Sequence, residues 1–255
     1  MPELLAIVPA YNEATRIAPV IAVLVGLGLP VLVVDDGSHD DTAAAARAAG
    51  ARVLRKPNGG KGSAILAGSA WAVDQGFRLA LFIDGDGQHD PREALRLIAA
   101  AKMLDQRGRE PFLVIGRRML RIECQPLHRR FLNRLSSLTV TFFAGRRIID
   151  SQSGFRLCDP ALLLRLPLAG RRYDLESEVC VLAGRAGITV TEVPITVIYN
   201  DKVSGLHPVW DTLRFLKAAV FAWFRARPWL RRATVSLRPT DAAADRAGIG
   251  QPALG

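Results

Sequence analysis

The sequence predicts an α/β protein with a mixed, mainly parallel sheet flanked by helices and with amphipathic helices toward its C-terminal end. Two observations lead to this prediction. Through position 116, short apolar runs alternate with helical stretches of roughly ten to fifteen residues, which is typical of a doubly wound sheet. A polar motif also follows each apolar run, and such sheets bind ligands at the carboxyl ends of their strands. The chain has 255 residues, 49% of them hydrophobic, which is enough for a sizeable core.

Each expected strand in the first half is an apolar run that stops at polar residues. These strands are expected at 4–9, 31–34, 51–56, 79–84 and 112–116. The helices between them are expected at about 14–27, 40–49, 62–76 and from Pro91 to about 104. The first helix has apolar residues at helical spacing, namely Ile17, Val20, Ile21 and Leu24. Gly50 is suited to end the second helix.

The second half is less regular. Helices are expected at 128–145, 174–186 and 209–226, and a strand at 188–199. Residues 233–255 lack periodicity and are rich in Ala, Pro, Gly and Asp, so we expect them to be disordered. The organisation that follows is one domain over 1–226, in two halves at 1–116 and 117–226, and a basic, then disordered tail at 227–255.

The polar motifs at the strand ends predict one composite site. In chain order they are PAYNE, DDGS, NGGKG, DGDGQHD and GRR. In the fourth motif, Gly85 and Gly87 permit a turn in which Asp84 and Asp86 converge. Two neighbouring carboxylates repel each other unless a cation lies between them, and hard oxygen ligands suit Mg²⁺ or Mn²⁺. The alternative for an isolated DxD is a solvated acidic turn, but its place after a buried strand favours the metal.

Several motifs, in this order and spacing, resemble the family 2 glycosyltransferases. They are VPAYNE (8–13), VVDDGSHDDT (33–42), NGGKGSA (58–64), DGDGQHDP (84–91), IGRR (115–118), DSQSGFRL (150–157), LESE (175–178) and EVPITVIY (192–199). The sequence is most similar to the dolichyl- and polyprenyl-phosphate mannosyl- and glucosyltransferase branch. The resemblance implies a GT-A fold, a GDP- or UDP-sugar donor, a divalent metal and inversion at the anomeric carbon.

The resemblance also implies roles for residues of the motifs. Residues for the nucleotide sugar are Pro9, Tyr11, Glu13, Asp36, Lys61, Asp84, Gly85, Asp86 and Arg117. Among these, the first four would hold the nucleoside. The metal would be held by Asp84 and Asp86, with Gln88 as a further oxygen ligand. Arg117 matches the family's phosphate-binding arginine, and the residues expected to take part in catalysis are Asp86, Arg117 and Lys202.

Lys61 and the acceptor residues keep alternative explanations. NGGKG is not a P-loop, so Lys61 contacts the diphosphate, supports the fold or caps a helix on the surface. The candidates for binding the acceptor are Arg129, Arg130, Arg156, Glu176 and Lys202. Arg134 is a further candidate, in the same segment as Arg129 and Arg130. Those three arginines equally suit a basic helix on a membrane. The loop at 199–208 has one lysine and an aspartate where an arginine is common, which leaves the acceptor open.

A hydroxyl acceptor, such as a lipid or glycan, would need a general base, whereas a polyprenyl phosphate is already anionic. Glu176 and Glu178 are the candidates for this base, and at most one of them should face the site because they are two positions apart on a helix. Both carboxylates also suit the helix dipole.

The formal net charge of +10 is concentrated in two segments, which predicts anionic partners. Residues 117–147 hold eight Lys/Arg and one Glu, and residues 201–232 hold seven Lys/Arg and two Asp. The second segment also carries aromatic residues, which suits a helix on the inner face of the cell membrane, although packing on the core explains it equally well. We expect a cytoplasmic, peripheral protein without a signal peptide and with no nucleic-acid partner.

Other kinds of site and two other classes of function fit less well. The three cysteines form no CxxC pair, which argues against a zinc site or a disulfide framework. A sugar nucleotidyltransferase would need a glycine-rich, basic loop after the first strand, where PAYNEAT stands. A non-enzymatic basic membrane-binding module accounts for the charge but not for DGDGQ.

Overall fold

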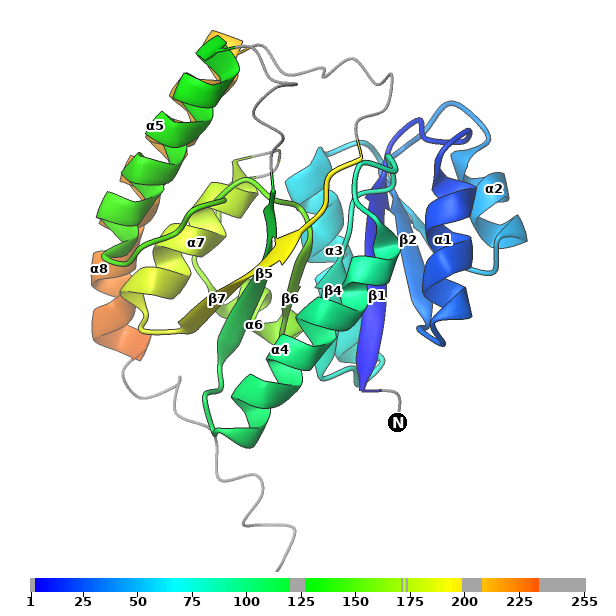
Figure 1. Cartoon of the computed structure of the whole chain (residues 1–255), viewed down its shortest axis with the longest axis horizontal. Helices are drawn as coiled ribbons and strands as arrows, with labels where there is room; N and C mark the ends of the chain where they lie inside the picture. The colour runs from blue at the N-terminus through cyan, green and yellow to red at the C-terminus, as the bar shows by residue number, and fades with distance from the viewer. Residues whose placement is uncertain (1–2, 120–126, 171, 173, 199–207, 234–255) are drawn as a thin grey trace, which may run out of the picture.

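Seven strands form one sheet in the computed structural model, which describes residues 3–119, 127–170, 172, 174–198 and 208–233 (Figure 1). Across the sheet the strand order is β3-β2-β1-β4-β6-β5-β7, and only β6 runs antiparallel to its neighbours. The strands are β1 (Leu4–Ala10), β2 (Val31–Asp35), β3 (Arg52–Arg55), β4 (Leu79–Phe82), β5 (Phe112–Arg118), β6 (Arg156–Cys158) and β7 (Thr189–Ile195). The mixed, mainly parallel sheet that the sequence predicts is confirmed.

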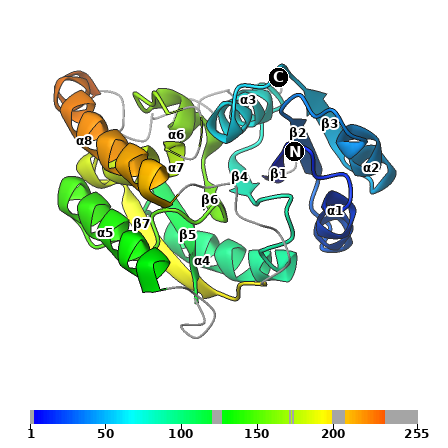
Figure 2. The ribbon, with the colours of Figure 1, turned by 90° about the horizontal axis from the view of Figure 1, so that it is seen from above.

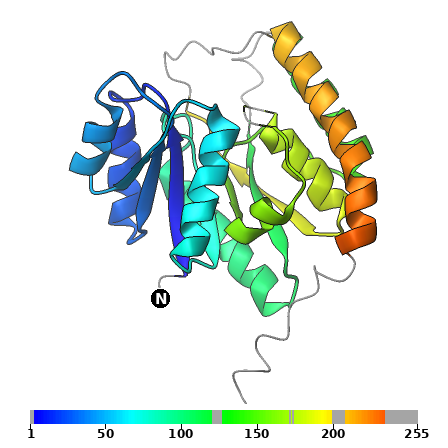
Figure 3. The ribbon, with the colours of Figure 1, turned by 180° about the vertical axis from the view of Figure 1, so that it is seen from behind.

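Helices cover both faces of this sheet (Figures 2 and 3). One face packs against α1 (Ile17–Gly26), α2 (Thr42–Ala48), the short η1 (Pro91–Glu93) and α4 (Ala94–Gln106). The other face packs against α3 (Lys61–Asp74), α6 (Pro160–Arg165) and α7 (Leu175–Arg185). The side chains of β1 alternate between the two cores, with Leu5 and Ile7 in one and Ala6 and Val8 in the other, as strand geometry requires.

Two long helices lie side by side and pack against α7 (Figures 2 and 3). They are α5 (Leu127–Ala144) and α8 (Pro208–Ala233). Gly184 of α7 allows a close contact with α5, because a Cβ at this position would lie 2.6 Å from the Ala144 carbonyl oxygen. Within the described residues, no helix combines the length and the apolar character needed to cross a bilayer.

The strand register and one glycine place the polar motifs next to one another. Ala10 pairs with Asp35, so the loop after β1 begins beside the loop after β2. Gly68 lets α3 lie close to the sheet, because a Cβ there would lie 2.7 Å from Ile7 Cγ2 and 3.0 Å from Val34 Cγ2. This close packing brings Lys61, the first residue of α3, to the carboxyl ends of the strands.

Three details of the second half differ from expectation. Strand β6 and helix α6 were not predicted. The strand is three residues long with a leucine in the middle, the helix is a short apolar run, and neither shows a periodicity that indicates an element. Helix α8 continues beyond the expected end at 226 to Ala233, so the expected tail begins as helix. A proline often ends or kinks a helix because it lacks an N–H donor, but here the helix continues past Pro228. The expected disorder of 234–255 lies outside the described residues.

Candidate functional site

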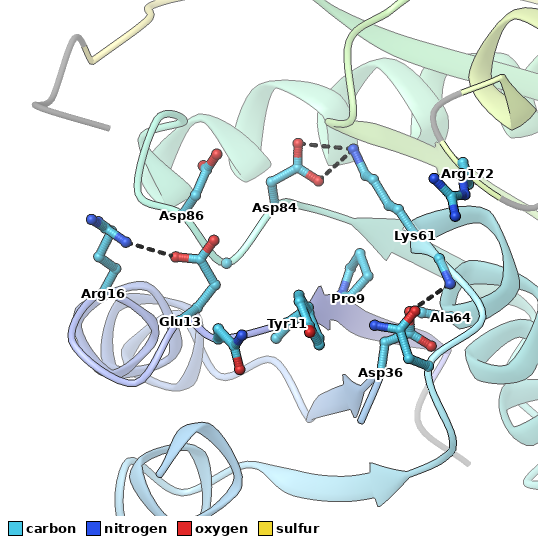
Figure 4. A pocket seen from close by; sticks show the side chains of 15 residues that line it. Pro9, Tyr11, Glu13, Arg16, Asp36, Lys61, Ala64, Asp84, Asp86 and Arg172 are labelled. Atoms are coloured by element: carbon cyan, nitrogen blue, oxygen red, sulfur yellow. Dashed lines mark hydrogen bonds and ion pairs between the residues drawn. The ribbon is translucent and has the colours of Figure 1, made fainter. Parts of the chain in front are cut away.

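One cavity opens where β1, β2 and β4 end, and it is lined by the loops that follow these strands and by the start of α3 (Figure 4). Its volume is about 490 Å³. Eight of the residues predicted to bind the nucleotide sugar line it, namely Pro9, Tyr11, Glu13, Asp36, Lys61, Asp84, Gly85 and Asp86. The structure thus brings these residues together, as the convergence of strand ends predicts, while their roles stay predictions.

Tyr11 and Glu13 lie on the loop that follows β1. The exposed Tyr11 ring meets the ring of His39 edge-on, with 6.4 Å between the ring centroids. The Glu13 carboxylate is buried and forms an ion pair with Arg16 at 3.2 Å. An exposed ring beside a carboxylate offers a face for stacking and an acceptor for N–H or hydroxyl donors.

Asp36 follows β2 directly and holds the turn that leads into α3. Its carboxylate accepts hydrogen bonds from the backbone N–H groups of Gly59, at 3.0 Å, and Gly60, at 2.7 Å. The Lys56 ammonium donates a further bond to it. The neighbouring Asp35 accepts a bond from the Ser38 N–H at 2.8 Å, so it supports its own turn. Asp36 therefore positions the start of α3 and also lines the cavity.

Asp84 and Asp86 follow β4 and both line the cavity (Figure 4). Asp86 Oδ1 accepts a hydrogen bond from the Gln88 N–H at 3.0 Å, which closes a tight turn. Gly87 adopts a φ of 73° in this turn, a conformation that favours glycine. The Gln88 side chain, predicted as a metal ligand, is not among those that line the cavity.

Lys61 joins the acidic turn to α7. Its Nζ lies 2.7 Å from Asp84 Oδ1 and 3.0 Å from Asp84 Oδ2, and 2.9 Å from Glu176 Oε1. Burial opposes the charge of the ammonium, but the two carboxylates outweigh it and raise the pKa of Lys61 above its ordinary value. The interpretation of Lys61 as a surface lysine is wrong, because its side chain is only 15% exposed.

The two glutamates of α7 point to different partners, as their spacing predicts. Glu176 is buried and reaches Lys61. The Glu178 carboxylate accepts hydrogen bonds from the N–H groups of Ala169 and Gly170, at 2.9 and 2.8 Å, and pairs with Arg225 of α8. Glu176 thus contacts a residue of the cavity, although it is not among the residues that line the cavity itself, and Glu178 ties a loop and α8 to α7.

Gly154 provides space for the pair of Asp84 and Lys61. A Cβ at Gly154 would lie 2.5 Å from Asp84 Oδ2 and 2.7 Å from Lys61 Nζ. Real Cβ atoms do not approach other atoms so closely, so any side chain at this position must displace the pair. Gly154 belongs to the DSQSGFRL motif and precedes β6, which shows how that motif reaches the acidic turn.

Two arginines end β5, and they have different surroundings. Arg118 forms two parallel bonds with Asp150, from Nε and from a terminal nitrogen, both at 2.8 Å. Burial opposes ionisation of Asp150, yet Arg118 outweighs it and lowers the pKa of this carboxyl. Arg117 is not among the residues that line the cavity. Its Nε is buried and has no hydrogen-bond partner among the described residues.

Among the predicted acceptor residues, the structure describes the side chains of Arg156 and Glu176. Arg156 is buried, and its guanidinium donates to the backbone carbonyls of Ser151, Ser153 and Glu176 at 2.7, 2.7 and 2.9 Å. With its donors committed to backbone, we expect Arg156 to hold the chain in place rather than to contact an acceptor. Arg129 and Arg130 belong to α5, but their side chains lie outside the described part of the structure, as does all of Lys202.

The cavity also contains residues that the sequence did not single out. They are Ala10, Asn12, Arg16, Asn58, Gly60, Ala64 and Arg172. Arg172 lies in the loop before α7 and adds a cation to the cavity from the second half of the chain (Figure 4). The pair of arginines before YDLESE is a signal that could have been noticed, because it precedes the helix whose start carries Glu176.

The acidic turn fits a divalent metal. Asp84 and Asp86 offer hard oxygen atoms at the cavity wall, and the Asp84 carboxylate already holds a cation, the Lys61 ammonium. Within the described ranges, no group of three or more His, Cys, Asp or Glu side chains is arranged to hold a metal. His89 is buried against Phe155, with 5.6 Å between ring centroids, and burial lowers its pKa.

Solved structures of glucosyl-3-phosphoglycerate synthase share this architecture. Glucosyl-3-phosphoglycerate synthase from Mycobacterium tuberculosis, in a complex with Mn²⁺, uridine-diphosphate-glucose and phosphoglyceric acid, matches with a TM-score of 0.67 and 19% sequence identity. The match covers 87% of this chain and 79% of that one. The fold is therefore that of the GT-A class, as the sequence resemblance implies.

The family follows from the sequence comparison. The chain matches the glycosyl transferase family 2 model over residues 5–165, and it belongs to that family. It is 30% identical to undecaprenyl-phosphate mannosyltransferase of Micrococcus luteus, over 79% of this chain and 87% of that protein. It is 31% identical to polyprenol monophosphomannose synthase of Mycolicibacterium smegmatis, over 79% and 81%. The resemblance to this family is confirmed, and so is the prediction that the protein is a hexosyltransferase.

Proposed function

We propose that this glycosyltransferase moves a hexose from a GDP- or UDP-sugar to a polyprenyl phosphate, with inversion at the anomeric carbon. One observation carries the proposal: a single cavity joins an exposed ring and carboxylates on the loops after β1 and β2 to the Asp84–Asp86 turn after β4. The relatives named above, which act on undecaprenyl phosphate and polyprenol by name, support the acceptor.

The donor would lie along the cavity with its base at Tyr11. The Tyr11 ring would stack on the base, and Glu13 and Asp36 would accept from base or ribose donors. A bound Mg²⁺ or Mn²⁺ at Asp84 and Asp86 would neutralise the charge of the departing diphosphate. Arg117 would bind a phosphate, and its buried Nε, which has no hydrogen-bond partner among the described residues, supports this role.

The acceptor phosphate would attack the anomeric carbon from the face opposite the diphosphate. A bond forms between the phosphate oxygen and this carbon, and the carbon–oxygen bond to the diphosphate breaks, with the electron pair leaving on the nucleoside diphosphate. The attacking oxygen is already anionic, so no residue must remove a proton. The ion pair between Glu176 and Lys61 favours this scheme over a hydroxyl acceptor, because a carboxylate that already holds an ammonium is a poor base.

The test is nucleoside diphosphate release from single nucleotide sugars in the presence of Mn²⁺. We expect release that depends on both the metal and a polyprenyl phosphate. The matched control is the corresponding polyprenol, which has the same chain and a hydroxyl in place of the phosphate. Equal release with polyprenol would assign a hydroxyl acceptor, and no lipid-stimulated release from any donor would overturn the proposed acceptor class.

We also propose that the α5–α8 pair rests on the inner surface of an anionic membrane, where a polyprenyl phosphate is found. Leu138 and Phe142 of α5 are 66% and 78% exposed and lie one helical turn apart. On α8, Phe221 and Phe224 are exposed, and the Arg227 guanidinium lies 4.0 Å from the centre of the Trp223 ring. Exposed apolar rings beside cations suit the interface of an anionic bilayer.

Replacing both Leu138 and Phe142 with serine should weaken binding to anionic vesicles by about tenfold, because two apolar side chains no longer enter the interface. Vesicle co-sedimentation measures this. The matched control is a double serine variant of Leu95 and Met103, which are 55% and 51% exposed on α4, on the other face of the sheet. Equal binding of the two double variants would contradict the proposed membrane surface.

A further inference from the structure

The ammonium of Lys61 is held between two carboxylates from distant parts of the chain. Asp84 belongs to the turn after β4, and Glu176 belongs to the first turn of α7. The three distances from Nζ to their oxygens lie between 2.7 and 3.0 Å. Figure 4 shows the Lys61 side chain extending from the start of α3 to Asp84. A cation thus already contacts both oxygens of Asp84, one of the two carboxylates assigned to the metal.

A divalent ion at Asp84 would compete with the Lys61 ammonium for the same oxygens. Like charges that share one carboxylate at contact distance repel each other, and little water is present to screen them, since Lys61 is 15% exposed and Asp84 24%. A metal ion that binds Asp84 must therefore displace the ammonium from at least part of this carboxylate. The free energy needed for this displacement makes the net free energy of metal binding less favourable.

Glu176 offers the displaced ammonium a second anchor. Its carboxylate is buried, and its Oε2 has no hydrogen-bond partner among the described residues, so it has room for a further bond. Its position is fixed, because Arg156 donates to its backbone carbonyl at 2.9 Å. Lys61 can therefore leave Asp84 without losing its counterion, by a change within its own flexible side chain.

We propose that Lys61 is a built-in counterion of Asp84 that yields this carboxylate to the metal and remains on Glu176. Lys61 is a positioning residue in this scheme. It keeps Asp84 neutralised while the site is empty and weakens metal binding until the donor diphosphate contributes oxygen ligands of its own. The inference rests on the proposed metal-dependent function, and it makes metal binding dependent on the nucleotide.

The test is the affinity for Mn²⁺ alone, measured by the electron paramagnetic resonance signal of the free ion, with no nucleotide present. Lys61→Met should bind Mn²⁺ about tenfold more tightly than the wild type, because the competing ammonium is gone. Glu176→Gln should bind it more weakly, because Lys61 then has only Asp84 as a partner. The two variants are thus expected to shift the affinity in opposite directions, whereas general damage would weaken both.

The double variant separates this scheme from a simple loss of negative charge near the metal. In the Lys61→Met background, Glu176→Gln should no longer change the affinity for Mn²⁺, because Glu176 acts through Lys61. A general charge effect would persist in that background. Lys56→Met is the matched control, since it removes a lysine from another aspartate, Asp36, and should leave Mn²⁺ affinity unchanged.

Two results would overturn the inference, and they are distinguishable. If Mn²⁺ binds to the wild type but Lys61→Met binds it equally or more weakly, Lys61 does not compete and only this inference fails. If no Mn²⁺ binds to any variant, even with GDP or UDP present, the metal assignment fails as well. Should Lys61→Met be unstable, the sign of the Glu176→Gln shift decides, because an unchanged or increased affinity contradicts the competition.

Discussion

Replacing Asp86 with asparagine should lower the turnover number about a thousandfold, which corresponds to roughly 4 kcal/mol of transition-state stabilisation. Asparagine keeps an amide oxygen that can still accept the bond from the Gln88 N–H, so the turn after β4 should survive. What is lost is the charge that would hold the metal and, through it, the leaving diphosphate. Steady-state release of nucleoside diphosphate, with thermal unfolding measured in parallel, checks this expectation.

Asp90→Asn is the matched control for Asp86→Asn. Asp90 lies in the same motif, and its carboxylate accepts a bond from the Arg92 N–H at 3.0 Å, the same type of contact that Asp86 makes. It does not line the cavity. The control should keep activity within about a factor of two of the wild type, since surface changes away from a site have small effects. If both variants lose activity alike, or neither does, Asp86 is not the charge that the reaction uses.

Gly154→Ala should lower turnover about a hundredfold while the protein remains folded, because a displacement of a reacting group by about 1 Å can cost that much. The added methyl group would lie within 2.5 Å of Asp84 Oδ2 and 2.8 Å of Asp84 Oδ1, so the carboxylate must move. Lys61 can give way through its long side chain, but Asp84 is short and attached to a tight turn. The measurement is turnover, together with the Mn²⁺ concentration that gives half-maximal activity, which should rise.

Gly26→Ala serves as the control for Gly154→Ala. Gly26 is the last residue of α1, and a Cβ there would meet nothing within 4 Å. This substitution should leave turnover unchanged and increase stability slightly, because alanine loses less conformational freedom than glycine. Wild-type turnover in Gly154→Ala would show that Asp84 is not held where the reaction needs it.

The sequence predicts most of the sheet and most of the residues that line the cavity, for a physical reason. Carboxyl ends of parallel strands meet at one edge, so motifs that follow β1, β2 and β4 must converge, whatever the details of their loops. Pro9, Tyr11, Asp36 and Asp84 illustrate this convergence, since each follows or ends one of these strands and lines the cavity.

Contacts that depend on packing were not predictable in this way. The ion pair between Lys61 and Glu176 joins α3 to α7 across the sheet end, and no spacing in the sequence reveals it. In the sequence Arg156 resembles a phosphate ligand, yet its guanidinium donates hydrogen bonds to three backbone carbonyls. Arg172 precedes α7 in the second half of the chain, yet it lines the cavity beside residues that follow β1, β2 and β4.

The position of β6 limits how this enzyme can move. Strand β6 forms backbone hydrogen bonds with β4 on one side and β5 on the other, so the two halves of the chain share one continuous sheet. A hinge between the halves would have to break these bonds, so we expect no rigid-body closure of the kind seen in two-lobed enzymes. We therefore expect the loops at the strand ends to adjust to ligands, while the continuous sheet holds the Asp84–Asp86 turn and the β5 arginines at a fixed separation.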